Sequence, residues 1–183
     1  VARIERIKNQ DNLIKPLNNT KYTPILIGSA SPKQQGYYRA CRRIAASNIR
    51  FMGQLDQAAL KFYYQRAKVH VLPSWFEACG LSSMEAAAMG CNIVISANGY
   101  TLEYYEDYAY YCDPVSPASI LNAINKASAA GFPEVLREKI LSEYTWPKAA
   151  ESISDAYHHI IYPHEHPHWN NRIKGYSQSL RRI

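Results

Sequence analysis

Short apolar runs alternate with longer amphipathic stretches along most of the sequence. Six runs have the length and the aliphatic content of β-strands, and they cover 1–4, 24–28, 49–52, 70–73, 92–96 and 109–112. Helical spacing of apolar residues is found at 9–17, 32–46, 56–67, 81–89, 117–129, 134–143 and 147–161. This alternation predicts an α/β fold, in which helices cover both faces of a parallel sheet.

The expected architecture is a Rossmann-like three-layer domain with a parallel sheet of about six strands, over residues 1–162. Ligands of such sheets bind beyond the carboxyl ends of the strands, so the residues after each strand are the candidates for chemistry. The periodic pattern ends after Tyr162, and we interpret residues 163–183 as a His-rich and then basic C-terminal tail.

The overall composition excludes several classes of protein. The 183 residues are 47% apolar and 20% charged, a balance typical of a soluble globular domain and not of a disordered chain. No apolar run approaches the roughly 18–20 residues of a membrane-spanning helix, and the start has no signal-peptide pattern. Because the sequence begins at Val1, inside an expected strand, we expect it to be a fragment of a longer protein.

The cysteines and the net charge constrain the function less. No C-x-x-C pair occurs among Cys41, Cys79, Cys91 and Cys112, which argues against a disulfide framework or zinc site and favours the reducing cytoplasm. The formal net charge of +6 suits a nucleic acid, an anionic membrane or a phosphorylated ligand, and charge alone does not choose among them.

A candidate phosphate site follows the strand predicted at 70–73. Gly80 lets the backbone approach a ligand closely, and the helix predicted from Leu81 would present the free amides of its first turn. These amides and the helix dipole attract phosphate, and the hydroxyls of Ser82 and Ser83 add donors.

Two glutamates flank this helix start. Glu85 lies about one turn into the helix, from where its carboxylate can accept two hydroxyl hydrogens of a ribose. Glu77, on the preceding loop, can bind sugar hydroxyls on the other side of the phosphates. Taken singly, the two acids would be ordinary surface residues, but here they accompany a strand end, a glycine and a helix start.

The stretch resembles the E-x7-E motif of glycosyltransferase family 4, whose usual form is close to P-S-x-x-E-x-x-G-L-x-x-x-E-A-x-A-x-G. The sequence matches that form from Pro73 to Gly90. The resemblance implies the C-terminal, donor-binding half of a retaining GT-B glycosyltransferase. It further implies that Glu77 contacts the donor sugar, that Glu85 contacts the ribose, and that the donor is also bound by Cys79, Gly80, Leu81 and Ser82.

A pair of cations follows the first predicted strand. Arg3 ends that strand and Lys8 begins the next helix, so both are expected over the same sheet edge. An arginine and a lysine can stabilise a departing diphosphate without a metal. The stretch resembles the family's V-G-R-x-x-x-x-K-(G/N), whose Arg and Lys contact that diphosphate, with Ala2 departing from the usual glycine. Arg3, Lys8 and Glu77 are therefore the candidate catalytic residues, and no metal or other cofactor is expected.

Other segments resemble the family through less specific residues. Gly28 is expected to face the donor from the second strand. Met52, with Gly53 and Leu55, is a candidate for lining the nucleobase pocket, although aliphatic residues at a strand end also suit a plain core. Glu103 is either close to the donor or an ordinary helix-start acid.

The remaining features indicate packing or solvent exposure. The tyrosines of 100–111 are expected to pack a half-exposed edge strand. The helix after Trp146 resembles the last family helix, which crosses back towards the N-terminal domain. Residues 164–168 contain ligand types for zinc or nickel, but we interpret them as tail, and the basic residues of 172–182 are a short, irregular candidate for contact with anionic lipid.

The leading hypothesis is a retaining glycosyltransferase that transfers a hexosyl group from a UDP- or GDP-sugar to an acceptor hydroxyl. An absent N-terminal domain would present an acceptor sugar or lipid-linked sugar, so the isolated domain is expected to be inactive, and no general base is identified. We expect a cytoplasmic protein of polysaccharide biosynthesis with peripheral contact to the inner face of the membrane, and no nucleic-acid partner.

Two alternatives stay open on the sequence. A nucleotide-sugar epimerase can share the GT-B architecture but needs acid and base residues around the sugar, and no such set is evident. A non-catalytic nucleotide-sugar-binding module is the other. A nicotinamide-dependent enzyme is excluded because no G-x-G-x-x-G follows the first strand.

Overall fold

The computed structural model describes residues 1–162. The chain divides into two compact units, Val1–Ile140 and Leu141–Ile183, of which the second is described only as far as Tyr162. The domain predicted over 1–162 therefore includes the whole first unit and the described part of the second. All strands of the described residues belong to the first unit.

Five strands form two sheets within the first unit, and every pairing is parallel. The first sheet has the order β1-β2 and the second has the order β3-β4-β5. The strands are β1 (Ile25–Ile27), β2 (Arg50–Gly53), β3 (Val69–Leu72), β4 (Asn92–Ser96) and β5 (Tyr110–Cys112). The predicted α/β class with parallel pairing is confirmed, and the five strands fall within or next to five of the six predicted runs.

The sixth predicted strand, at 1–4, is not assigned as a strand. Its backbone nevertheless pairs with the end of β1, because the Ala2 amide donates to the Ile27 carbonyl at 3.0 Å and the Ile4 amide donates to Ser29 at 2.9 Å. On its other side the Val1 amino nitrogen lies 3.4 Å from Nε2 of His70, on β3. This segment thus lies between the two sheets and joins them.

Gly28 makes this close approach sterically feasible. Its φ of +142° is unfavourable for residues with a side chain, and a Cβ built there would lie 1.9 Å from the Ala2 carbonyl oxygen. The structure therefore gives Gly28 a packing role against the 1–4 segment. Its predicted contact with a donor stays a prediction.

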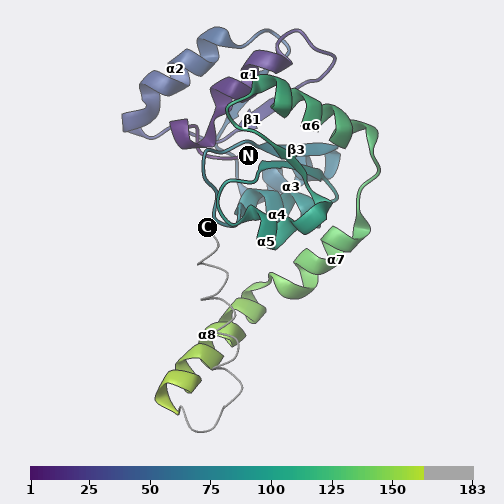
Figure 1. Ribbon diagram of the computed structural model, residues 1–183. Helices are drawn as coiled ribbons and strands as arrows, with labels where there is room; N and C mark the ends of the chain where they lie inside the picture. Colours follow the sequence, from purple (N-terminus) through teal and green to yellow (C-terminus); the bar gives the residue numbers. More distant parts are fainter. Residues whose placement is uncertain (163–183) are drawn as a thin grey trace. The chain divides into compact units, whose positions relative to one another are not determined.

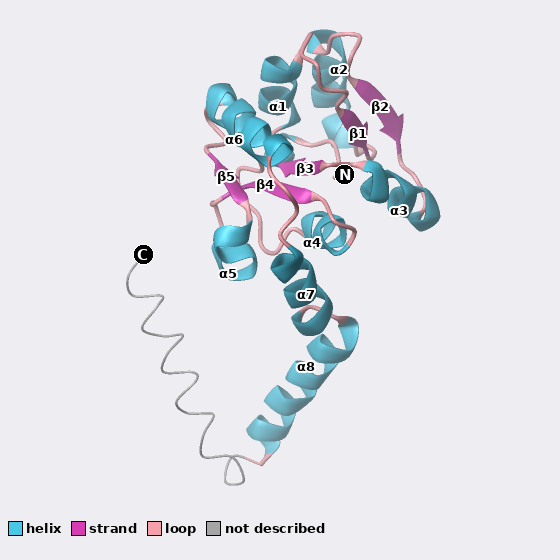
Figure 2. Cartoon of the chain, turned by 90° about the vertical axis from the view of Figure 1, so that its right-hand side faces the viewer, coloured by secondary structure: helices cyan, strands magenta, loops and turns pink. Residues whose placement is uncertain are grey.

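Helices cover both faces of the sheets (Figures 1 and 2). One layer contains α1 (Gln10–Leu17), α2 (Gln35–Ile44) and α6 (Pro117–Ala129), and the other contains α3 (Gln57–Arg66), α4 (Leu81–Ala88) and α5 (Thr101–Tyr105). Short 3-10 turns are η1 (Arg6–Lys8), η2 (Pro32–Gln34) and η3 (Glu106–Tyr108), and the last helices are α7 (Glu134–Glu143) and α8 (Trp146–Ile161). The three-layer prediction is confirmed.

Local sequence signals account for several of the helix boundaries. Asp56 caps α3, since its Oδ1 accepts a hydrogen bond from the Ala59 amide at 2.8 Å, as its position before the helix predicts. Ser116 caps α6 in the same way, with proline in the first turn. The predicted ranges 117–129 and 134–143 agree with α6 and α7, whereas the helix predicted at 32–46 is a 3-10 turn followed by α2.

The core is most complete around β4, all five of whose residues are buried. Ile93, Val94 and Ile95 have no exposed surface, as expected of a central parallel strand covered on both faces. Aliphatic residues of α1 and α6 complete the core on one side, including Ile14 and Ile120. This buried strand lies beside β3, after which the candidate site begins.

The prediction that the tyrosines of 100–111 pack an edge strand is wrong for most of the segment. Residues Thr101–Tyr105 form α5, and the strand contains only Tyr110 and Tyr111 among the tyrosines. The driving force is burial: Tyr105 has no exposed surface, which a helix on the sheet face achieves and an edge strand would not.

The described part of the second unit is dominated by α8, which Thr145 caps through a hydrogen bond from the Lys148 amide. Among the helices of residues 1–162, none combines the length and hydropathy that a membrane crossing requires. The tail predicted at 163–183, including its His-rich and basic stretches, lies outside the described residues.

Candidate functional site

The candidate site is built on the loop between β3 and α4, which carries Glu77. The backbone of Glu77 is fixed on both sides by the segment after β4. Its amide donates to the Asn98 carbonyl at 3.0 Å, and its carbonyl accepts from the Tyr100 amide at 3.1 Å, so that Glu77 and Gly99 form an isolated parallel bridge. The segment that follows β4 thus holds the Glu77 backbone in place.

The Glu77 side chain is paired with Lys8. Nζ of Lys8 lies 2.6 Å from Oε2 of Glu77, and the Ser74 hydroxyl donates to the same oxygen at 3.1 Å. Only 18% of the Lys8 side chain and 12% of the Glu77 side chain are exposed, so the pair is shielded from water and from salt. Two residues predicted from separate motifs are therefore brought together.

Asn9 fixes the position of the chain next to Lys8. It has a left-handed backbone conformation, with φ 59° and ψ 36°, which explains why glycine or asparagine suits the position. Its buried side-chain amide donates to the carbonyls of Pro73 at 3.0 Å and Pro114 at 2.8 Å. Asn9 therefore links the start of α1 to the chain that follows β3 and β5, and so positions Lys8 next to the Glu77 loop.

The first turn of α4 provides free amides beside this pair. Gly80 precedes the helix in a left-handed conformation, with φ 65° and ψ 62°, which turns the chain from the loop into the helix. The amides of Ser83 and Met84 donate to the Gly80 carbonyl, whereas none of the described residues accepts from the amides of Leu81 and Ser82. These two donors are the ones available to an anion.

Ser83 does not contribute a donor to this surface, contrary to its prediction. It is buried, and its Oγ lies 3.3 Å from Nδ1 of His70 on β3. Burial lowers the pKa of His70 well below its ordinary value, so that the imidazole is neutral. A neutral imidazole and the Ser83 hydroxyl can form one hydrogen bond, whose donor depends on the tautomer of His70. Ser83 therefore fastens α4 to the sheet.

Tyr105 is a residue that the sequence reasoning missed. Its hydroxyl lies 2.9 Å from the Cys79 carbonyl oxygen and 3.1 Å from that of Gly80, at the turn into α4. Burial raises the pKa of Tyr105 well above its usual range, so the hydroxyl stays protonated and donates. Its position within a run of tyrosines gave no signal of this role, because the contact spans 25 residues or more.

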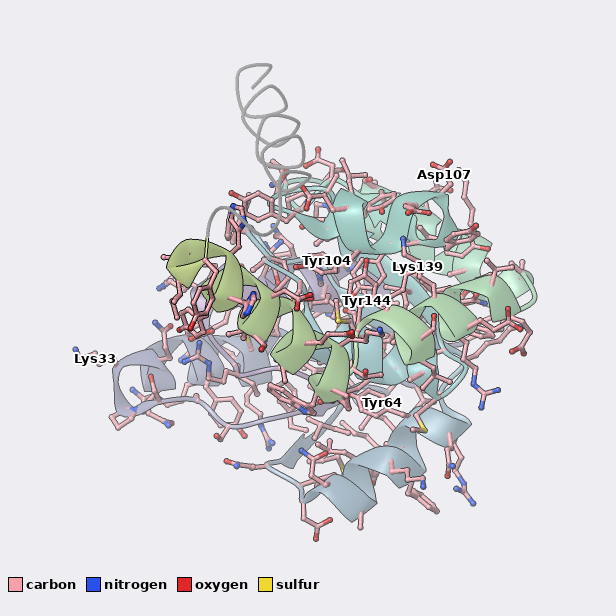
Figure 3. All side chains as sticks on the ribbon, turned by 90° about the horizontal axis from the view of Figure 1, so that it is seen from below. Lys33, Tyr64, Tyr104, Asp107, Lys139 and Tyr144 are labelled. Atoms are coloured by element: carbon pink, nitrogen blue, oxygen red, sulfur yellow. The ribbon has the colours of Figure 1, made fainter. Side chains whose placement is uncertain are left out.

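Glu85 lies on the exposed side of α4, next to Tyr64 at the end of α3. The Tyr64 hydroxyl donates to Oε2 of Glu85 at 3.1 Å, and Tyr64 is labelled in Figure 3. Burial and the neighbouring Glu85 carboxylate raise the pKa of Tyr64 well above its usual range. Tyr64 thus orients one carboxylate oxygen and leaves the other free to accept.

Arg3 is placed differently from Lys8. Its guanidinium lies 3.1 Å from Oε1 of Glu5, and its side chain is 76% exposed. Among the described residues it has no recorded contact with Lys8 or Glu77. The two cations therefore do not meet in this structure: Lys8 pairs with Glu77, whereas Arg3 pairs with Glu5.

The remaining candidates occupy exposed or loop positions. Met52, at the end of β2, is 39% exposed, and the Leu81 side chain is 63% exposed beside the free amides. Cys79 is partly buried and contributes its carbonyl to Tyr105. Glu103 lies exposed within the short helix α5, in its first turn, as the helix-start interpretation predicts.

A cavity among the described residues is lined by residues of β1 and β3. Its volume is about 450 Å³, and its lining is mainly apolar, with Leu13, Ile25, Val71 and Ile124 among the lining residues. Lys8 is among its lining residues, but Glu77, the start of α4 and Glu85 do not line it. This cavity is therefore largely separate from the candidate site.

No group of three or more histidine, cysteine or acidic residues within 1–162 is arranged to hold a metal ion. The His-rich stretch at 164–168 lies outside the described residues. The four cysteines are all free thiols, and three of them, Cys41, Cys91 and Cys112, are buried. The expectation that no metal takes part in donor binding stays a prediction.

Comparisons with known proteins are consistent with this arrangement. The family described as glycosyl transferases group 1 matches residues 1–144. An uncharacterized glycosyltransferase of Methanocaldococcus jannaschii is 29% identical over 114 residues, which is 58% of this chain and 29% of that protein. The chain thus spans less than a third of the length of this curated relative.

Solved structures show the same fold. A sucrose-phosphate synthase from Thermosynechococcus elongatus aligns with a TM-score of 0.76 and 24% identity, over 88% of this chain and 44% of that one. The Anabaena protein HepE, in complex with UDP and glucose, aligns with a TM-score of 0.65 and 20% identity, over 84% of this chain and 46% of that one. Fold, parallel sheets and matched residues fit the Rossmann-like C-terminal domain of a GT-B protein, and the chain belongs to the group 1 glycosyltransferases.

Proposed function

We propose that this chain is the donor-binding part of a retaining glycosyltransferase, which transfers a hexosyl group from a UDP- or GDP-sugar to an acceptor hydroxyl. The observation that carries the proposal is the Lys8–Glu77 pair, held at 2.6 Å beside the free amides of Leu81 and Ser82. A diphosphate needs cations and aligned amides, and a sugar needs a hydrogen-bond acceptor. This arrangement offers both in one place.

The proposed roles follow from the donors and acceptors that remain available. An ammonium group has three hydrogens, so Lys8 can hold Glu77 and a phosphate oxygen together. Both recorded contacts to the Glu77 carboxylate are to Oε2, which leaves Oε1 for a sugar hydroxyl. Arg3, mostly exposed beside Glu5, can exchange that carboxylate for a phosphate.

In the proposed reaction, the bond between the anomeric carbon and the diphosphate oxygen breaks, and a bond to the acceptor oxygen forms. The leaving diphosphate gains negative charge, which Lys8, Arg3 and the amides of Leu81 and Ser82 stabilise without a metal. We assign no residue of 1–162 as the base that takes the acceptor proton. The acceptor is a sugar or a lipid-linked sugar, presented by an N-terminal domain.

Several observations support the choice of a nucleotide donor. Tyr64 leaves one oxygen of the Glu85 carboxylate free for a ribose diol. The Anabaena protein with the same fold was crystallised with UDP and glucose.

Free thiols at all four cysteines suit a cytoplasmic enzyme, and the residues of 172–182 suit contact with the inner face of the membrane.

Calorimetric titration of the chain with UDP, GDP and ADP tests the proposal. We expect one nucleotide to bind with a dissociation constant of about 0.1–1 mM, or roughly −5.5 to −4 kcal/mol. The Arg3→Ala variant should abolish this binding, while Lys15→Gln, a surface change on α1, should preserve it. Addition of EDTA should change nothing. Equal binding of all three nucleotides by the wild type and Arg3→Ala would contradict the proposal.

A further inference from the structure

Positive charge is concentrated in one part of this chain. Residues 12–55 contain seven of the 21 lysines and arginines, and none of the 15 aspartates and glutamates. This stretch therefore has a formal charge of +7, and the rest of the chain has a formal charge of −1. Within residues 1–162, the positive charge is therefore concentrated in this stretch, which includes α2.

Three of these cations lie on the outer face of α2. Successive residues of a helix are rotated by about 100°, so Arg39, Arg42 and Arg43 share one side, opposite to Tyr37 and Cys41. Tyr37 and Cys41 are the buried residues of α2, whereas the three arginines are exposed. Lys33, in the preceding turn η2, also projects outwards, as Figure 3 shows. We call Lys33, Arg39, Arg42 and Arg43 the basic face.

Nothing in the described residues neutralises the basic face. No carboxylate of 1–162 forms an ion pair with any of its four members. Arg39 and Arg43 are one helical turn apart, a spacing at which like charges destabilise a helix. The helix dipole favours Arg42 and Arg43 in the last turn, but it disfavours Lys33 ahead of the first turn. An anionic partner would remove this repulsion.

We propose that the basic face binds the surface of an anionic lipid bilayer. A row of cations along the outside of a helix meets a surface whose negative charge is spread over many headgroups. The face has no exposed aromatic platform on which unpaired bases could stack, because Tyr37 is buried and the Tyr38 ring packs edge-on against Phe51 at 5.8 Å. The Arg42 guanidinium covers the same Phe51 ring at 5.2 Å.

Membrane binding through this face is separate from donor binding. Within the first unit, Figures 1 and 2 show α2 at the opposite end from α4 and α5. The Lys8 side of the candidate donor site is nearer, since Arg6 of η1 lies over the Tyr37 ring of α2 at 5.5 Å. Tyr37, however, is on the buried side of α2, opposite to the basic face. A variant of the basic face should therefore leave nucleotide affinity unchanged. The orientation would bring one end of the first unit against the headgroups and leave the donor site towards the solvent.

Cosedimentation of the full chain with vesicles tests the proposal. Vesicles of phosphatidylcholine alone are compared with vesicles that also contain phosphatidylglycerol, at physiological ionic strength. We expect binding only to the anionic vesicles, and we expect Arg39→Gln/Arg43→Gln to weaken it about 30-fold, since each basic residue near the surface contributes a factor of about five. The matched control is Lys61→Gln/Lys68→Gln, which removes two exposed lysines outside 12–55 and should retain binding.

Any of three outcomes of these binding experiments would overturn the proposal that the basic face binds anionic lipid. Wild-type protein that does not bind anionic vesicles, or binds neutral ones equally well, would exclude an electrostatic membrane surface. An equal loss in both double variants would show that net charge, and not the basic face, is responsible. Binding to a DNA duplex without binding to phosphatidylglycerol vesicles would assign the face to nucleic acid. Calorimetry with the nucleotide that the wild type prefers among UDP, GDP and ADP separates these results from the proposed function, because both variants should match the wild type.

Discussion

Lys8 and Glu77, which are 69 positions apart in the chain, form an ion pair with 2.6 Å between Nζ and Oε2. Each residue is predicted to contact a different part of the donor, the diphosphate and the sugar. Because one oxygen of Glu77 also accepts from Ser74, the carboxylate is held in one orientation before any donor arrives. Such preorganisation lowers the entropic cost of binding.

The pair predicts different effects for its two members. Lys8→Gln removes a charged donor from the diphosphate and should weaken binding of the preferred nucleotide by about 10–100-fold, or about 1.5–3 kcal/mol. Glu77→Gln should leave the affinity for the nucleotide nearly unchanged but abolish any gain in affinity from the attached sugar. Calorimetry with UDP and a UDP-sugar, or with GDP and a GDP-sugar, measures both. If Glu77→Gln weakened the plain nucleotide as much as Lys8→Gln did, the assignment of roles would be wrong.

Glu85 and Tyr64 predict how the ribose is bound. Glu85→Gln should cost about 1.5–3 kcal/mol of affinity for the nucleotide, because a carboxylate accepts hydroxyl hydrogens more strongly than an amide. The same variant should cost little for the 2′,3′-dideoxy nucleotide, which lacks both hydroxyls. Tyr64→Phe should have a smaller effect with the same dependence on the hydroxyls, since it only releases the carboxylate. Equal losses for both nucleotides would place Glu85 away from the ribose.

Tyr105 predicts a link between folding and the donor site. Tyr105→Phe leaves the Cys79 carbonyl without its recorded side-chain donor and should reduce the free energy of unfolding by about 1–3 kcal/mol. It should also weaken nucleotide binding, because the turn that starts α4 loses its support. Urea unfolding and calorimetry measure the two effects. Tyr100→Phe, which changes a half-exposed tyrosine of the same run, is the control and should alter neither.

Gly28 predicts a steric effect on stability. In Gly28→Ala, the new Cβ would lie 1.9 Å from the Ala2 carbonyl oxygen at an unfavourable φ, so the 1–4 segment must move. We expect a loss of about 3–5 kcal/mol in the free energy of unfolding. Gly36→Ala, within α2 and with nothing within 4 Å of the added atom, should instead stabilise the protein by about 0.5–1 kcal/mol. A neutral Gly28→Ala would mean that the 1–4 segment does not pack as described.

His70 predicts a pH dependence of stability. Burial holds the pKa of His70 well below its unfolded value near 6.5, so below that pH the unfolded chain binds a proton that the folded chain does not. The stability is therefore complete above pH 6.5 and falls as the pH decreases, by up to about 1.4 kcal/mol per pH unit. Urea unfolding of the wild type and of His70→Gln between pH 7.5 and about 4.5 isolates this contribution. Parallel curves for the two proteins would contradict the prediction.

Local patterns in the sequence determined most of the secondary structure. The start of α4 at Leu81 and the bounds of α6 and α7 agree with the prediction, because helix periodicity, capping residues and terminal glycines act over a few residues. The same locality explains the glutamate spacing: Glu77 and Glu85 lie on one loop and the helix that follows it. The class of fold followed from the order of these elements.

Only the tertiary structure decided which side chains meet. The pairing of Lys8 with Glu77, of Tyr64 with Glu85, and of Tyr105 with the Gly80 turn joins residues that are 69, 21 and 25 positions apart. No periodicity encodes these distances, since they depend on the sheet that packs the elements together. The 1–4 segment is the clearest case: its sequence suits a strand, but its hydrogen bonds depend on the close approach that Gly28 allows.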